Sequence, residues 1–198
     1  LVGRKWYGDR FDIETEQTYG FSFPNVITAN PMSVSVRAAA IADNETNMEV
    51  SVNGELINSF TMQPTGSDMP STTGSTITQA TVTQDSVNVK LNYNKNGNPA
   101  ATAFLNYIRL EADRELKYAD DQLIFNYQKN NPQSEIIEFN IGNASSVDQV
   151  WDISEWTSIS SINSNQELGN FSYKLNVTDQ AKKFIAFSND ELLRPQFE

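Results

Sequence analysis

Strict alternation of apolar and polar residues is the feature that most limits what this chain can fold into. The segment 33–40 alternates Ser, Val, Ser, Val, Arg and Ala, and the segments 47–52, 87–93 and 171–177 show the same period of two. A period of two places one kind of side chain on each face of a β-strand. The sequence therefore predicts an all-β protein built from sandwiches rather than from a parallel sheet. Helix is expected nowhere except for one turn within 178–184.

The expected strands fall into two groups, which predict two domains. Strands are expected near 33–40, 47–62, 77–93 and 104–112, and then near 115–119, 122–128, 135–141, 149–153, 170–177 and 183–187. We place a first β-sandwich domain at 1–113 and a smaller β domain at 114–198. No internal repeat at a fixed period is found.

Turn-forming residues mark the connections between these strands. Asn53-Gly54 lies between two alternating runs, and this pair is typical of a type I′ hairpin turn. The stretch 63–76 is rich in Thr, Ser, Gly and Pro, which predicts a long polar loop.

Composition excludes several classes of function. The chain has no Cys and no His, so it contains no Cys–His pair, Ser–His–Asp triad, zinc finger or disulfide. A formal charge of −11 argues against nucleic acid as a partner, because affinity for nucleic acid depends mainly on Lys and Arg. No apolar run is long enough to span a membrane. The chain also lacks an initiator Met, and we expect it to be a fragment of a longer protein.

Carboxylate pairs are the first candidates for chemistry. They are Glu14 with Glu16, Asp120 with Asp121, and Glu135 with Glu138. A glycosidase needs two carboxylates facing one bond at roughly 5–10 Å. Nothing in these spacings separates such a pair from a solvated strand face, so no catalytic, cofactor-binding or metal-binding residue is assigned.

Calcium is the second candidate. The segment 9–14 contains Asp9, Asp12 and Glu14, and the segment 43–45 reads Asp-Asn-Glu. Such oxygen donors can hold Ca²⁺ in a loop of a β-sandwich, although neither segment matches an EF-hand. Structural calcium is therefore left open, and no other cofactor is expected.

Aromatic residues are the third candidates, because aromatic rings stack on sugars. The candidates are Trp6, Tyr7, Trp151 and Trp156. The competing interpretation is structural: Trp6-Tyr7 begins a strand region, and Trp151 packs in a core within Val-Trp-Asp-Ile. Four Asn-x-Ser/Thr sequons begin at Asn44, Asn143, Asn170 and Asn176, and chance accounts for them in a chain so rich in Asn, Ser and Thr.

Six segments in a fixed order carry a family resemblance. They are Trp-Tyr-Gly-Asp-Arg-Phe-Asp at 6–12, Phe-Ser-Phe-Pro-Asn at 21–25, Val-Ser-Val-Asn-Gly at 50–54, Phe-Leu-Asn-Tyr-Ile-Arg-Leu at 104–110, Val-Trp-Asp-Ile at 150–153 and Phe-Ile-Ala-Phe at 184–187. In this order and spacing the chain resembles the region before the peptidase domain in the PorU family, the type IX secretion system sortases. These are gingipain-like cysteine peptidases of Bacteroidetes. After Ile153 the family often has a Pro-containing turn, where this chain has Ser-Glu-Trp-Thr at 154–157.

The resemblance implies a function for the parent protein rather than for this chain alone. The family removes the C-terminal signal of secreted cargo at the outer membrane and joins the cargo to an anionic lipopolysaccharide. Its catalytic Cys and His lie in a caspase-like domain that would begin shortly after Pro195, so no catalytic residue is carried over to this chain. The segments at 50–54 and 105–110 are also similar to galactose-binding-like jelly rolls, which implies a jelly roll for 1–113.

We therefore expect a non-catalytic accessory region of an outer-membrane sortase, located at the outer membrane, the cell surface or the periplasm. Its expected partners are its own downstream peptidase domain and either secreted cargo or secretion-system subunits. The alternative is a carbohydrate-binding β-sandwich module with a glycan as ligand. A third interpretation, an adhesin-like stalk, ranks last because no repeat is found.

Overall fold

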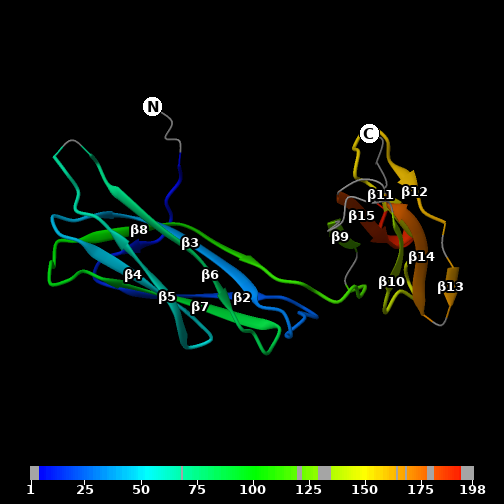
Figure 1. The fold of residues 1–198 in the computed structure, drawn as a ribbon, viewed down its shortest axis with the longest axis horizontal. Helices are drawn as coiled ribbons and strands as arrows, with labels where there is room; N and C mark the ends of the chain where they lie inside the picture. Colours follow the sequence, from blue (N-terminus) through cyan, green and yellow to red (C-terminus); the bar gives the residue numbers. More distant parts are fainter. Residues whose placement is uncertain are drawn as a thin grey trace, which may run out of the picture. The chain divides into compact units, whose positions relative to one another are not determined.

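The computed structural model describes residues 5–67, 69–119, 122–128, 135–163, 165–167, 169–177 and 181–192. The chain is an all-β protein of antiparallel sheets, as the alternation predicts, and the one helical element among the described residues is a short 3-10 helix, η1 (Asn189–Glu191). It divides into two compact units, Leu1–Glu115 and Leu116–Glu198 (Figure 1). The division lies two residues after the predicted boundary at 113/114, and the independent folding of each unit stays a prediction.

Within its described residues, the first unit is a jelly roll of eight strands. They are β1 (Arg10–Phe11), β2 (Glu16–Ser22), β3 (Met32–Ile41), β4 (Thr46–Val52), β5 (Glu55–Met62), β6 (Thr72–Ala80), β7 (Ser86–Asn94) and β8 (Thr102–Glu111). One sheet has the order β1-β8-β3-β6 and the other the order β2-β7-β4-β5. The first strand pairs with the last, the second with the seventh, and so on inward, which is the jelly-roll topology.

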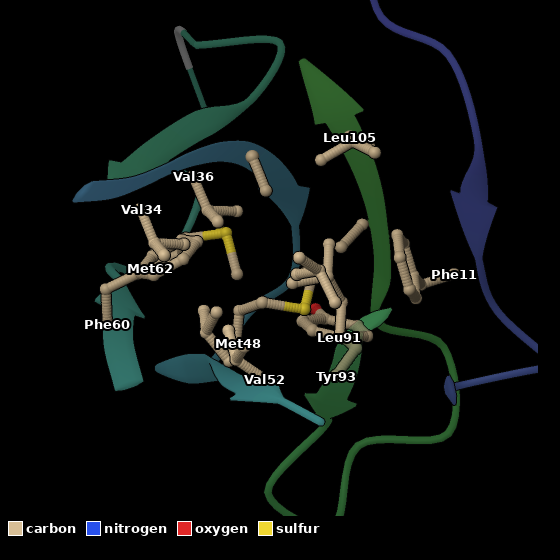
Figure 2. Packing of buried hydrophobic residues seen from close by; sticks show 14 of the residues in the cluster. Phe11, Val34, Val36, Met48, Val52, Phe60, Met62, Leu91, Tyr93 and Leu105 are labelled. Carbon is tan, nitrogen blue, oxygen red and sulfur yellow. The ribbon is translucent and has the colours of Figure 1, made fainter. Parts of the chain in front are cut away.

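Mostly aliphatic and methionine side chains fill the core of the first unit, with a few aromatic rings among them. Val34 and Val36 of β3 face Met48 of β4 and Leu91 of β7, and all four are fully buried. Figure 2 shows these side chains converging between the two sheets, with Phe11 and Tyr93 at one side. The alternation seen in the sequence thus arises because every second residue of these strands points into this core.

The turn at Asn53-Gly54 has the predicted form. Asn53 has φ 49° and Gly54 has φ 90°, so both central residues occupy the left-handed region that a type I′ turn needs. The turn joins β4 to β5, and a bulge between Val50 and Ser51 adjusts the register just before it. The hairpin prediction is confirmed.

A glycine allows the two sheets to approach closely at one edge. A Cβ atom at Gly74 of β6 would lie 2.6 Å from the Thr61 carbonyl oxygen and 2.7 Å from Phe60 Cδ2, both on β5. Real Cβ atoms do not come so close to other atoms, so only glycine fits at this crossing.

The second unit is a smaller pair of sheets. Its strands are β9 (Gln122–Gln128), β10 (Glu135–Ile141), β11 (Gln149–Asp152), β12 (Ser160–Ser161), β13 (Asn165–Glu167), β14 (Asn170–Val177) and β15 (Ala181–Phe187). Their orders are β10-β14-β13 and β12-β11-β15-β9. A second core cluster, separate in its membership from the first, lies between these sheets.

Aromatic rings dominate this second core. The Phe184 ring centroid lies 5.2 Å from those of both Phe125 and Phe139, and Phe139 stacks on Tyr173 at 4.9 Å. Tyr127 meets Phe139 edge-on at 5.7 Å. Contacts of this geometry add to the burial of the rings, and they let a small unit bury a large apolar area per residue.

The structure differs from the sequence-based expectations in several places, and β1, β12 and β13 also lie outside the expected strands. Glu16–Ser22 forms β2, and β6 begins at Thr72 inside the expected loop 63–76. The segment 115–119 contributes one isolated bridge, Lys117 with Gly142, rather than a strand. The helical turn expected within 178–184 is wrong for 181–184, which belong to β15, and 178–180 lie outside the described residues. None of the described segments is a helix long and apolar enough to cross a membrane.

Candidate functional site

The first calcium candidate lies at one end of the jelly roll, where its carboxylate contacts two basic side chains. Asp12 Oδ1 accepts a hydrogen bond from Lys95 Nζ at 3.1 Å, and Asp12 Oδ2 contacts Arg10 Nη2 at 2.6 Å. Lys95 also donates to the Pro99 carbonyl oxygen at 3.1 Å, and only 17% of its side chain is exposed. The charge of Asp12 is therefore already balanced by protein groups.

The second calcium candidate lies at the same end, because the turn at 95–98 contacts both segments. Asn44 Nδ2 donates to the backbone carbonyl oxygens of Glu45, Lys95 and Asn96 at 3.1, 3.2 and 3.3 Å. Asn98 Nδ2 in turn donates to Asn44 Oδ1 at 2.9 Å. Converging carbonyl oxygens are the donors that Ca²⁺ prefers, but here they surround an amide nitrogen.

The residues present therefore do not fit a calcium ion at this end of the sandwich. The Lys95 ammonium group already contacts the Asp12 carboxylate, and the Asn44 amide nitrogen already contacts the converging carbonyl oxygens. Within the described ranges, no cluster of three or more acidic side chains could hold a metal ion.

The carboxylate pairs do not form an acid–base site. Glu16 pairs with Lys90 at 3.2 Å on the outer face of the first unit, and Glu14 is exposed just before β2. Glu135 and Glu138 are three apart on β10, so they point to opposite faces: Glu135 accepts from Tyr127 Oη, and Glu138 lies 3.7 Å from Lys174. The pair Asp120 and Asp121 lies outside the described residues.

The tryptophans are distributed over both units. Trp6 is 80% exposed in the first unit and Trp156 is 84% exposed in the second, and Tyr7 beside Trp6 is 37% exposed. Trp151 is partly buried but is not part of the core, because Val150 takes the inward position on β11. The expected core position of Trp151 is therefore wrong. Its ring packs edge-on against Phe187 at 5.0 Å, and its Nε1 donates to Gln149 Oε1 at 2.8 Å.

The Trp-Asp-Ile motif has a structural role that the sequence left open. Asp152 Oδ1 accepts from Ser154 N at 2.9 Å, Asp152 Oδ2 accepts from Lys182 Nζ at 3.1 Å, and Ser154 Oγ accepts from Lys183 N at 2.9 Å. Burial acts to raise the pKa of Asp152, but the hydrogen bonds from Ser154 and Lys182 outweigh it and lower that pKa. The motif thus ties the end of β11 to β15.

A hollow of about 320 Å³ lies beside this motif in the second unit. Tyr127, Ser154 and Lys182 are among its lining residues. The Ser154 hydroxyl donates to Asp152, and Lys182 is paired with the same carboxylate. The serine therefore donates to a carboxylate whose lowered pKa makes it a weak base, poorly suited to activate the hydroxyl as a nucleophile.

The two outer faces of the jelly roll differ in charge. On the β2-β7-β4-β5 sheet, Asn92 Nδ2 donates to Glu49 Oε2 at 2.9 Å and Lys90 pairs with Glu16, so the charged groups are satisfied within the face. The outer face of the other sheet carries Arg37 on β3 and Tyr107 and Arg109 on β8. Sequence reasoning missed this face, and its only signal was an arginine at a polar position of an alternating strand.

Comparison with known proteins gives a fold match but no sequence match. No model of a known protein family matches the chain, and no curated protein matches it. Dimeric latent PorU from Porphyromonas gingivalis matches 95% of this chain and 19% of its own length, with a TM-score of 0.74 and 18% identity. The chain has the fold of one region of PorU. It spans about a fifth of the length of that solved structure.

A second solved structure is similar only in part. It is the carbohydrate-binding module CBM36 in complex with calcium and xylotriose, with a TM-score of 0.38 and 17% identity over 56% of this chain and 92% of the module. A similarity this low carries no argument about ligands of the present chain. The resemblance to the sortase family is thus confirmed at the level of the fold, across both units.

Proposed function

We propose that this chain is a non-catalytic accessory region of a gingipain-like sortase of the type IX secretion system, located at the outer membrane or cell surface. The observation that carries the proposal is the match to PorU over 95% of the chain, which includes both units in order. The absence of Cys and His from the sequence supports a region without the catalytic pair of a cysteine peptidase.

In this proposal the chain holds the peptidase domain in place and offers surfaces to cargo signals or secretion-system subunits. Its open sheets support such a role, because they end in edge strands such as β9 whose outer backbone groups can pair with another chain. Isolated activity is not expected from it.

The test is to supply the chain in trans to the separately expressed peptidase domain of the same parent protein. We expect binding by isothermal titration calorimetry and a higher melting temperature of the peptidase domain, because a ligand that binds only the folded state stabilises it. A thiol-independent peptidase activity in the purified chain, or no interaction with the peptidase domain, would contradict the proposal.

A second candidate function is glycan binding, which the two exposed tryptophans favour. Trp6 and Trp156 are 80% and 84% exposed, and an exposed ring is available for stacking on a sugar. A glycan array with the chain and with its Trp6→Ala and Trp156→Ala variants tests this. A signal that one of these substitutions abolishes would favour the binding module over the accessory region.

A further inference from the structure

The outer face of the β1-β8-β3-β6 sheet carries a small basic surface, here called the arginine face. It consists of two rows of residues that lie directly across three neighbouring strands: Ser75, Arg37 and Tyr107, and then Ile77, Ser35 and Arg109. Ile77 is 78% exposed and Tyr107 is 42% exposed. The face therefore combines two guanidinium groups with an apolar and an aromatic side chain, and it also carries Glu111, which lies opposite Ser33 and pairs with Arg109.

Arg37 is the unusual member of this face. Its Nε atom is buried and has no hydrogen-bond partner, and the one hydrogen bond of its side chain to a described residue is from Nη2 to Thr73 Oγ1 at 3.4 Å. No described carboxylate lies within ion-pair distance of it, although the sequence has 25 acidic and only 14 basic residues. The Nε atom is enclosed and cannot itself reach a ligand, but Nη1 has no hydrogen bond to a described residue and is not fully buried, so this nitrogen is open to an acceptor from outside the chain.

Arg109 is available to a ligand because its ion pair is exposed to solvent. It pairs with Glu111 two residues away on the same strand, and the side chains are 68% and 58% exposed. An exposed pair of this kind contributes roughly 0–1 kcal/mol, so an incoming carboxylate can replace Glu111 at little cost. Both arginines can thus accept an anion, and a guanidinium favours carboxylate because the two groups form parallel hydrogen bonds.

The spacing of the two arginines fits an extended peptide. Arg37 and Arg109 are diagonal neighbours on adjacent strands, which places such side chains about 7–8 Å apart. Alternate side chains of an extended strand point the same way and lie about 6.7 Å apart. A peptide with acidic residues two apart can therefore address both guanidinium groups, while its remaining atoms contact Ile77 and Tyr107.

We propose that the arginine face binds an extended acidic segment of a partner protein, with one carboxylate on Arg37 and a second on Arg109. The inference rests on the proposed docking role of the chain, and it names the face and the chemistry of the partner. The exposed isoleucine favours a peptide over an acidic polysaccharide, because its apolar surface gains little from a ligand covered with hydroxyl groups.

The test uses the full chain and a fluorescently labelled peptide of alternating Asp and Thr, with alternating Asn and Thr as the uncharged probe. We expect the Asp peptide to bind by fluorescence anisotropy and the Asn peptide not to bind. Arg37→Gln is expected to weaken binding about tenfold or more, and Arg109→Gln less, because charge-assisted bidentate contacts are the strong ones. Lys90→Gln, which makes the same change of charge on the other sheet, is expected to alter affinity less than about twofold.

Equal effects of Arg37→Gln and Lys90→Gln would overturn the proposal, as would equal binding of the two peptides. Binding of polygalacturonate but not of the Asp peptide, with dependence on Arg37, would assign the face to an acidic sugar instead and also overturn it. Arg109→Gln keeps the test valid if Arg37→Gln fails to fold, since Arg109 is exposed. None of these assays contains the peptidase domain, so their failure is distinct from failure of the proposed function.

Discussion

The two units solve the same packing problem with different side chains. The jelly roll buries Val, Ala and Met between two four-stranded sheets, whereas the ring–ring contacts found among the described residues all lie in the smaller second unit. A small unit has a high ratio of surface to volume, so it needs more apolar area from each buried residue. The comparison indicates that stability is spread over many positions in the first unit and concentrated in a few rings in the second.

The largest expected effect tests whether the stability of the second unit depends on a few aromatic rings. Phe184→Ala removes a fully buried ring that contacts Phe125, Phe139 and Tyr173, and it should cost about 3–5 kcal/mol of the free energy of unfolding. Denaturant unfolding followed by NMR signals assigned to each unit measures it. Trp156→Ala, in the same unit but 84% exposed, is the control and should change stability by less than about 0.5 kcal/mol. A small loss of unfolding free energy for Phe184→Ala would show that a few rings do not carry the stability of the second unit.

The next largest expected effect is on the stability of the first unit. Gly74→Ala places a Cβ atom 2.6 Å from the Thr61 carbonyl oxygen, so β6 must move away from β5, at a cost of about 1–3 kcal/mol. Gly66→Ala is the matched control, because a Cβ there meets nothing within 4 Å. Equal melting temperatures for the two variants would show that this crossing tolerates a side chain.

A smaller effect depends on pH and concerns the second unit. Asp152 has a lowered pKa, so its hydrogen bonds to Ser154 and Lys182 stabilise the folded state above the ordinary pKa of 3.8 and are lost as the pH falls through the folded value. Asp152→Asn should cost about 1–3 kcal/mol near neutral pH, and the difference from the natural chain should shrink at acidic pH.

Thermal unfolding of both proteins across this pH range measures the difference. Glu138→Gln is the control, because that glutamate forms an exposed pair with Lys174. A difference between Asp152→Asn and the natural chain that stays constant down to low pH would show that the carboxylate is not linked to folding.

The smallest expected effect is that of calcium on the jelly roll. Because Lys95 and Arg10 already contact Asp12, adding Ca²⁺ or a chelator should shift the melting temperature by less than about 2 °C, which corresponds to less than about 1 kcal/mol in a chain of this size. A clear rise with Ca²⁺ that a chelator reverses would restore the calcium site that the sequence left open.

Local sequence patterns predicted most of the fold. The period of two located β3, β4, β7 and β14, and Asn53-Gly54 located a hairpin, because these signals depend only on residues near each other in the chain. The strand Glu16–Ser22 was missed because it alternates polar residues with only partly buried Tyr19 and Phe21. The start of β6 was missed because Thr, Gly and Ser also compose loops.

The candidate sites were predicted less well, because each depends on contacts between distant residues. Asp12, Asn44 and Lys95 meet only after the jelly roll has formed, so the sequence offered two oxygen-rich segments and gave no sign of the ammonium beside them. The partner of Asp152 is Lys182, thirty residues away, and nothing in the Trp-Asp-Ile motif indicates it. Arg37 stood out only when its neighbours on β6 and β8 were known.

In both units the last strand among the described residues is an interior strand. β8 lies between β1 and β3, and β15 lies between β11 and β9. A nascent chain that lacks β8 or β15 therefore has a gap in the middle of a sheet, with unpaired backbone groups on both sides of it. Pairing of such distant segments is slow, on the order of milliseconds to seconds. The sheet that contains β8 and the sheet that contains β15 are thus continuous only once these late strands have been added.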